Sequence, residues 1–197
     1  MAASSTNNLK LAEKGGWVSI IAYIVLSIGQ IAFAAIVHSS ALQANGFNNV
    51  TDIMGNIAIL IGLRLARIPA DSDHVYGHWK IESIASLISS FIMFFVGFEV
   101  LRETVMTLLS GKEEAIDPLG ALVGLFSAFV MLGVYLYNRA LAKKTNSQAL
   151  SAASKDNLSD AVTSIGTVVA ILASSVGWEW LDTAMAIVIC GFILKTA

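Results

Sequence analysis

The sequence has little charge, almost no cysteine or proline, and no excess of basic residues. Charged residues make up 13% of its 197 residues, about half the share of a soluble domain. The single cysteine excludes an internal disulfide, and a net charge of −2 offers nucleic acid no basic surface. Neither of the two prolines interrupts a long apolar stretch. With a mean hydropathy of +0.73, these shortages indicate a chain whose surface faces lipid.

Long apolar stretches fill most of the chain. A helix needs about 20 mainly apolar residues to cross a bilayer, and six stretches meet that length. We therefore expect an all-α membrane protein, a six-transmembrane-helix bundle over residues 17–197 that follows a polar cytoplasmic N-terminal segment, residues 1–16. The expected helices are Trp17–Val37, Ala41–Leu65, Ile81–Leu101, Leu119–Leu141, Gln148–Val176 and Leu181–Ala197.

The basic residues predict the orientation of these helices. Cytoplasmic loops are enriched in lysine and arginine, and ten of the twelve basic residues fall on one side when six helices alternate in direction. Only Arg102 and Lys112 fall on the other side. We therefore expect both termini in the cytoplasm, together with Lys10, Lys14, Arg64, Arg67, Lys80, Arg139, Lys143, Lys144, Lys155 and Lys195.

Two of the expected helices carry polar residues where lipid would not tolerate them alone. An ionisable side chain at the bilayer centre costs roughly 2.5–3.5 kcal/mol on insertion scales. Asn48 and Asp52 share one face of the second helix, and Asp156 and Asp160 share one face of the fifth, because each pair is four residues apart. Asp52 and Asp160 lie near the midpoints of antiparallel helices, so the two faces can meet at one depth. Three adjacent carboxylates need protons or a cation to balance them, which predicts an intramembrane divalent-metal site.

Each of these residues also has a structural interpretation. Asp156 could cap a helix start, and Asn48 could form an interhelical hydrogen bond. The matching spacing and depth of the two pairs favour the metal site. Three further amides lie beside the pairs and are candidates for the ion pathway or for support of the ligands: Asn56, Asn49 and Asn157.

A second polar group lies in the loop between the second and third helices. Residues 69–80 contain Asp71, His74 and His78, which form a candidate second metal site. Alternatively, the two histidines order the loop or cap the following helix. Both interpretations remain open from the sequence.

Three separated motifs resemble the cation diffusion facilitator family. They read ALQANGFNNVTD at 41–52, PADSDHVYGHWKIE at 69–82 and DNLSDA at 156–161. The loop motif has Trp79 where a glycine is more usual in the family, and Asp182 opens the sixth expected helix in the family's pattern. The motifs agree in order and spacing, so the resemblance covers essentially the whole chain.

The resemblance implies a homodimer that exports divalent metal from the cytoplasm, usually against protons. By motif match, the transport site is Asn48, Asp52, Asp156 and Asp160, and the loop metal of some relatives falls on Asp71 and His78. Family members usually add a cytosolic domain after the sixth helix. That domain is absent from this sequence, which we therefore expect to be the transmembrane part of a longer protein.

The predicted quartet has no histidine. Carboxylate, carbonyl and water ligands suit Mn²⁺, whereas imidazole and thiolate suit zinc. The set of one asparagine and three aspartates resembles the manganese-exporting branch of the family, so we expect Mn²⁺/H⁺ antiport by alternating access with no resident cofactor. Zinc, iron and cadmium remain alternative cargoes, because intrinsic affinity favours zinc over Mn²⁺.

Two other classes of protein compete with a transporter. Aspartates on two membrane helices also form the dyad of intramembrane aspartyl proteases, but the tyrosine-aspartate and glycine-rich aspartate motifs of those enzymes are missing here. A membrane scaffold without transport is the third hypothesis. In all cases we expect a multi-pass protein of a cell membrane, in particular a bacterial inner or plasma membrane.

Overall fold

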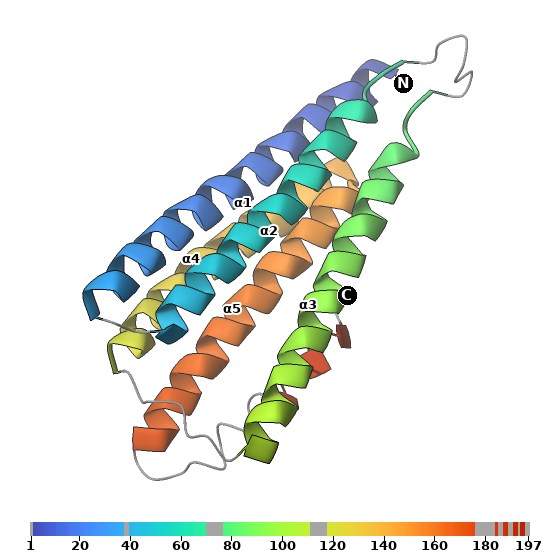
Figure 1. Cartoon of the computed structure of the whole chain (residues 1–197). Coiled ribbons are helices and arrows are strands. Elements are labelled where there is room, and N and C mark those ends of the chain that lie inside the picture. Colours follow the sequence, from blue (N-terminus) through green and yellow to red (C-terminus); the bar gives the residue numbers. More distant parts are fainter. Residues whose placement is uncertain are drawn as a thin grey trace.

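The computed structural model describes residues 2–37, 40–69, 77–110 and 118–175, and seven single positions between 184 and 195. The described part contains five long helices that run side by side (Figure 1). The start of α1, the end of α2, the start of α3 and the α4–α5 link lie at one end (Figure 1). The helices are α1 (Ala2–Val37), α2 (Ser40–Leu65), α3 (Ile81–Ser110), α4 (Pro118–Thr145) and α5 (Gln148–Ser175).

Four of these helices form a bundle, and α3 packs beside it. α1 contacts α2, α4 and α5, while α4 lies along α5. α3 contacts α2 and α5, so α2 and α5 are covered on both sides. Two buried apolar clusters fill the interior; the first is Ala12, Ile59, Leu63, Ala142, Ala149, Leu150 and Ala153, and the second is Tyr23, Leu26, Met131 and Ala161.

Large apolar side chains cover the outside of the helices. Ile28, Phe95 and Phe129 are each about two-thirds exposed, at 66%, 66% and 67%. Water-soluble proteins seldom expose such continuous apolar surface, and helices satisfy their backbone hydrogen bonds without water. Asn7–Ile36, Ile81–Glu99 and Ala121–Thr145 are long and apolar enough to cross a membrane. The expected all-helical membrane architecture is therefore confirmed.

The predicted helix boundaries differ most at α1 and α3. α2, α4 and α5 begin and end within a few residues of the expected positions. α1 begins at Ala2 rather than near Trp17, so the polar N-terminal segment is helical, and α3 continues to Ser110. Hydropathy marks the edge of the bilayer, whereas a helix continues as long as its side chains find contacts; Leu9 and Ala12 pack in the first apolar cluster. The sixth expected helix lies largely outside the described residues.

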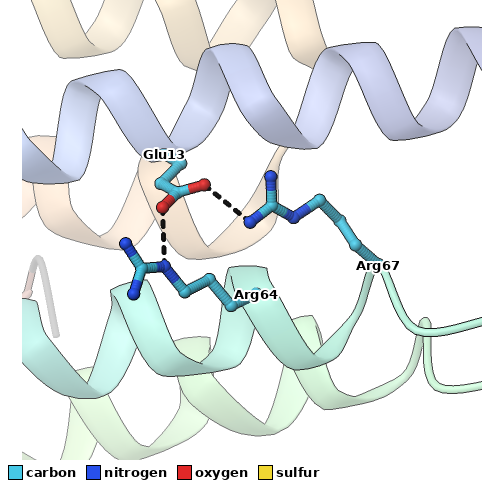
Figure 2. Close-up of polar contacts among 3 residues, drawn as sticks. All are labelled: Glu13, Arg64 and Arg67. Atoms are coloured by element: carbon cyan, nitrogen blue, oxygen red, sulfur yellow. Dashed lines mark hydrogen bonds and ion pairs between the residues drawn. The ribbon is translucent and has the colours of Figure 1, made fainter.

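An ion-pair cluster joins α1 to the end of α2 (Figure 2). Glu13 Oε1 lies 2.7 Å from Arg64 Nε, and Glu13 Oε2 lies 2.7 Å from Arg67 Nη2. The Arg64 guanidinium also lies over the Trp17 ring, 5.9 Å from its centre. One carboxylate thus binds two arginines and holds the first turns of α1 against α2.

A glycine allows α2 and α3 to approach closely. A Cβ atom added to Gly62 would lie 2.2 Å from the Cβ of Ala85, closer than any real contact. The two backbones can therefore touch only because residue 62 lacks a side chain.

The short link between α4 and α5 sets the register of α5. Asn146 takes the left-handed conformation, with φ of 55°, and Ser147 Oγ accepts the backbone N–H of Leu150 at 3.2 Å. Ser147 Oγ also donates to Glu82 of α3 at 2.5 Å. This serine cap fixes where α5 begins, and hence which of its residues face the bundle interior.

Candidate metal centre

Three carboxylates converge in the interior of the bundle. Asp52 comes from α2, and Asp156 and Asp160 come from successive turns of α5. One oxygen of each carboxylate lies within 4.8 Å of an oxygen of the other two. Asp52 is only 5% exposed, and neither aspartate of α5 is an exposed residue. The two helix faces identified from the i, i+4 spacing therefore do meet.

Asn48 lies at the margin of this group. Its Nδ2 donates to Asp52 Oδ2 at 3.4 Å, but the residue as a whole is exposed. Asn48 and Asp160 both line a cavity of about 60 Å³ between α1, α2, α4 and α5. The amide group of Asn48 thus lies beside Asp52 with its nitrogen directed at the carboxylate, on the side of the site that borders the cavity.

Tyr23 of α1 contacts the site, although it was not among the residues predicted from the sequence. Its hydroxyl donates to Asp160 Oδ2 and lies 3.4 Å from Asp156 Oδ2. The hydroxyl also accepts a hydrogen bond from Asn157 Nδ2 at 3.0 Å. Tyr23 is fully buried, so α1 contributes a polar group to a site that the sequence assigned to α2 and α5 alone.

The three amides beside the quartet have separate surroundings. Asn157 reaches the carboxylates through Tyr23. Asn56 is fully buried, and its Nδ2 donates to the backbone oxygen of Asp52 at 3.0 Å. Asn49 instead donates to Gln30 of α1 at 2.7 Å, and Gln30 donates to Ser127 of α4 at 2.8 Å. Asn49 therefore helps to join three helices, and its amide nitrogen is directed at Gln30 rather than at a carboxylate of the site.

A polar stripe on α1 is the sequence signal that could have revealed these contacts. Ser19, Tyr23, Ser27 and Gln30 follow one another at spacings of four, four and three residues, which places them on one helix face. In an otherwise apolar helix, such a stripe must face other polar groups or water. All four side chains form hydrogen bonds inside the bundle.

The loop cluster cannot be assembled in the same way. Asp71 and His74 lie outside the described residues, and His78 alone is described, as a half-buried residue before α3. The second metal site at Asp71, His74 and His78 therefore stays a prediction.

The donor atoms at the main site are all oxygens. Three carboxylates and one amide from two helices can offer four ligands to a cation, with water or backbone oxygen to complete the shell. Carboxylates packed this closely repel one another unless protons or a cation offset their charge. A site of this kind can exchange a divalent ion for protons, because metal binding requires deprotonated ligands.

Comparison with known protein families agrees with this geometry. The family model for the cation efflux transmembrane domain matches residues 16–197. The chain belongs to the cation efflux family. This confirms the resemblance to the cation diffusion facilitators that the three motifs suggested.

The similar proteins include bacterial metal exporters. The chain is 49% identical over 191 residues to the manganese efflux system protein MneS of Bacillus subtilis, covering 97% of this chain and 66% of that protein. It is 30% identical over 183 residues to MneP, another manganese efflux system protein of that organism, covering 90% of this chain and 61% of MneP. The magnetosome protein MamM of Magnetospirillum gryphiswaldense is 29% identical over 177 residues, covering 87% of this chain and 55% of MamM. The chain thus spans somewhat less than two-thirds of the length of these relatives.

Membership of this family decides between the classes of protein considered above. Its members are transporters rather than enzymes, so the intramembrane aspartyl protease hypothesis is wrong. The long apolar helices and the bacterial relatives together indicate a multi-pass cell membrane protein.

Proposed function

We propose that this cation efflux domain exports Mn²⁺ from the cytoplasm in exchange for protons. The observation that carries the proposal is the convergence of Asp52, Asp156 and Asp160, with oxygens within 4.8 Å of one another in the bundle interior. A buried group of three carboxylates has no stable ionised state without a counter-charge. A divalent cation and protons are the two counter-charges that can alternate there.

The donor chemistry favours Mn²⁺ over zinc. Asn48 and the three aspartates supply oxygen ligands only, which suit an octahedral ion such as Mn²⁺ better than tetrahedral zinc. The manganese efflux names of MneS and MneP point the same way. Zinc, iron and cadmium remain the alternative cargoes, and direct competition between ions tests the preference.

The expected transport cycle is alternating access. Asp52 on α2 and the two aspartates on α5 bind the ion from the cytoplasm, the bundle then opens to the outside, and external protons neutralise the carboxylates and release the ion. The basic residues lie mainly at the end of the bundle shared by the start of α1 and the α4–α5 link (Figure 1), which favours that end as the cytoplasmic one. We also expect the homodimer that is usual in the family.

Proteoliposomes test the exchange directly. The purified chain is reconstituted with a Mn²⁺-sensitive and a pH-sensitive dye trapped inside, and Mn²⁺ is added outside. We expect Mn²⁺ entry coupled to proton exit, and Mn²⁺ binding in detergent that weakens from pH 8 to pH 5.5 because protons compete for the carboxylates. Asp160→Ala should abolish both signals, whereas Glu99→Ala, which removes an exposed carboxylate of α3, should leave them unchanged.

Three results would contradict separate parts of this proposal. Undiminished Mn²⁺ transport by Asp160→Ala would show that the site is wrong. Transport of Zn²⁺ with no response to Mn²⁺ would show that the cargo is wrong. Mn²⁺ affinity that stays constant from pH 5.5 to 8 would argue against exchange for protons.

A further inference from the structure

The Tyr23 hydroxyl contacts both aspartates of α5. It donates to Asp160 Oδ2 and lies 3.4 Å from Asp156 Oδ2. A phenol has one proton to donate, so the two carboxylates compete for the same donor. The aromatic ring packs with Leu26 and Met131 in the second apolar cluster. Phenylalanine would fill that space equally well, so packing of the ring does not account for the hydroxyl.

The orientation of this hydroxyl is fixed by a second layer of hydrogen bonds. Asn157 Nδ2 donates to the Tyr23 oxygen at 3.0 Å, which leaves the tyrosine proton for the carboxylates. Asn157 Oδ1 accepts from Ser19 Oγ at 3.1 Å and from Asn138 Nδ2 at 3.0 Å. Asn138 Nδ2 also donates to Ser19 Oγ at 2.7 Å. Residues of α1, α4 and α5 thus hold the phenol in one position.

Each of these four side chains is fully buried, with 0% of its surface exposed. The network restricts the arrangement of its members and is disturbed when one of them is removed. Among the described residues, Asn138 Oδ1 is the one buried side-chain atom of these four residues without a hydrogen-bond partner. The network ends at the two carboxylates of α5 that the proposed transport cycle uses. It therefore links the position of the ligands to residues that do not touch the ion.

We propose that Tyr23 is a positioning residue of the metal site, and that Asn157, Ser19 and Asn138 act through it. The inference rests on the proposed function. Tyr23 engages one oxygen of each α5 carboxylate and leaves the other oxygen of each for the cation. Partners that orient metal ligands in this way typically contribute 10–100-fold to metal affinity.

Tyr23→Phe is the direct test because it removes one oxygen atom and keeps the ring. We expect Mn²⁺ to bind roughly 10–100-fold more weakly, measured by calorimetry on the purified chain. We also expect the electron paramagnetic resonance spectrum of bound Mn²⁺ to broaden as the ligand geometry becomes less uniform. Tyr137→Phe is the matched control, since that tyrosine lies on α4 and is 46% exposed; its affinity and spectrum should equal those of the parent.

A second variant separates positioning from general stability. Asn157→Leu removes the group that orients the phenol and keeps a similar volume, so it should weaken Mn²⁺ binding in the same direction. Because both residues act through one hydroxyl, the affinity of the double variant should fall no further than that of Tyr23→Phe alone. If the losses of Mn²⁺ affinity of the two single variants simply add in the double variant, the two residues act independently and the inference is overturned. If Asn157→Leu does not fold, Tyr23→Phe alone decides the question.

The outcomes distinguish this inference from the proposed function. If the parent binds Mn²⁺ and Asp160→Ala does not, while Tyr23→Phe binds within twofold of the parent, Tyr23 has no positioning role and the transport site stands. If the parent binds no divalent metal, the proposed function fails and this inference fails with it. A lower Mn²⁺ affinity of Tyr23→Phe, with the affinity of the Tyr137→Phe control unchanged, supports both the inference and the proposed function.

Discussion

Replacing Asp156 with asparagine should stabilise the metal-free protein while impairing its metal site. The substitution keeps the shape of the side chain and removes one of three neighbouring negative charges. The neutral hydroxyl of Tyr23 lies 3.4 Å from Asp156 Oδ2, and the carboxylates of Asp52 and Asp160 lie close by. The substitution therefore mainly removes charge repulsion, which should raise the stability of the protein.

The size of this gain follows from the spacing of the carboxylates. One oxygen of each carboxylate lies within 4.8 Å of the others, and two unit charges at that separation repel by about 3.5 kcal/mol at an effective dielectric constant near 20. Asp156 takes part in two such pairs, so its own repulsion in the fully ionised group is about 7 kcal/mol. The protein can instead protonate one carboxyl, which for an ordinary aspartate costs about 1.4 kcal/mol for each pH unit above 4. The gain from Asp156→Asn is therefore limited to about 5–6 kcal/mol at pH 8 and about 3 kcal/mol at pH 6.

Thermal unfolding in detergent, with a chelator present, measures this difference. A gain of even 2 kcal/mol should raise the midpoint by about 4–8 °C for a chain of this size, and the rise should be larger at pH 8 than at pH 6. Added Mn²⁺ should then stabilise the parent much more than the variant. Glu99→Gln is the control, because its exposed pair with Arg102 contributes at most about 1 kcal/mol. A lower midpoint for Asp156→Asn at pH 8, or a gain independent of pH, would refute the repulsion argument.

Two further substitutions test the packing that positions the site. Gly62→Ala should cost about 1–3 kcal/mol, because the new Cβ would lie 2.2 Å from Ala85 Cβ; Gly133→Ala, which meets no atom within 4 Å, should be neutral or stabilising in the same melting assay. Ser147→Ala removes the cap at the start of α5, where Ser147 Oγ accepts the Leu150 N–H, and should cost about 1 kcal/mol; an unchanged melting midpoint would show that the cap contributes nothing.

The core of the candidate site could be predicted because ionisable residues are costly in apolar helices. Asp52, Asp156 and Asp160 are conspicuous in that setting, and their helical spacing fixes a shared face on each helix. Whether the two faces meet depends on the rotation of α2 and α5 about their axes. Hydropathy does not report rotation, so the convergence required the structure.

Other features depend on contacts that the sequence indicates only in part. The polar stripe on α1 indicates that Tyr23 faces polar groups, but the side chains that Tyr23 and Asn138 touch are set by the packing of α1 and α4. Gly62 and Gly133 both lie in apolar helices, yet only Gly62 meets a neighbouring helix at close range. The early start of α1 at Ala2 was missed because the residues before Trp17 are too polar to be recognised as part of a membrane helix.

The hydrogen bonds of α1 have a mechanical consequence for transport. α1 is joined to α2 at two separated places: Glu13 binds Arg64, and Ser27 Oγ donates to the backbone oxygen of Gly46 at 2.9 Å. Gln30 accepts from Asn49 close by. We expect a pair of helices joined at such widely spaced points to move together.

Among the described residues, Ser19 and Tyr23 form the hydrogen bonds from α1 to α5, and Gln30 and Ser19 are also hydrogen-bonded to α4. If α1 travels with α2 when α2 rocks away from α5, the same displacement breaks the contact between Tyr23 and Asp160 together with these bonds to α4. The movement that exposes the carboxylates would thus break the hydrogen bond that positions them. Release of the ion would in this way be coupled to the movement of α1 and α2.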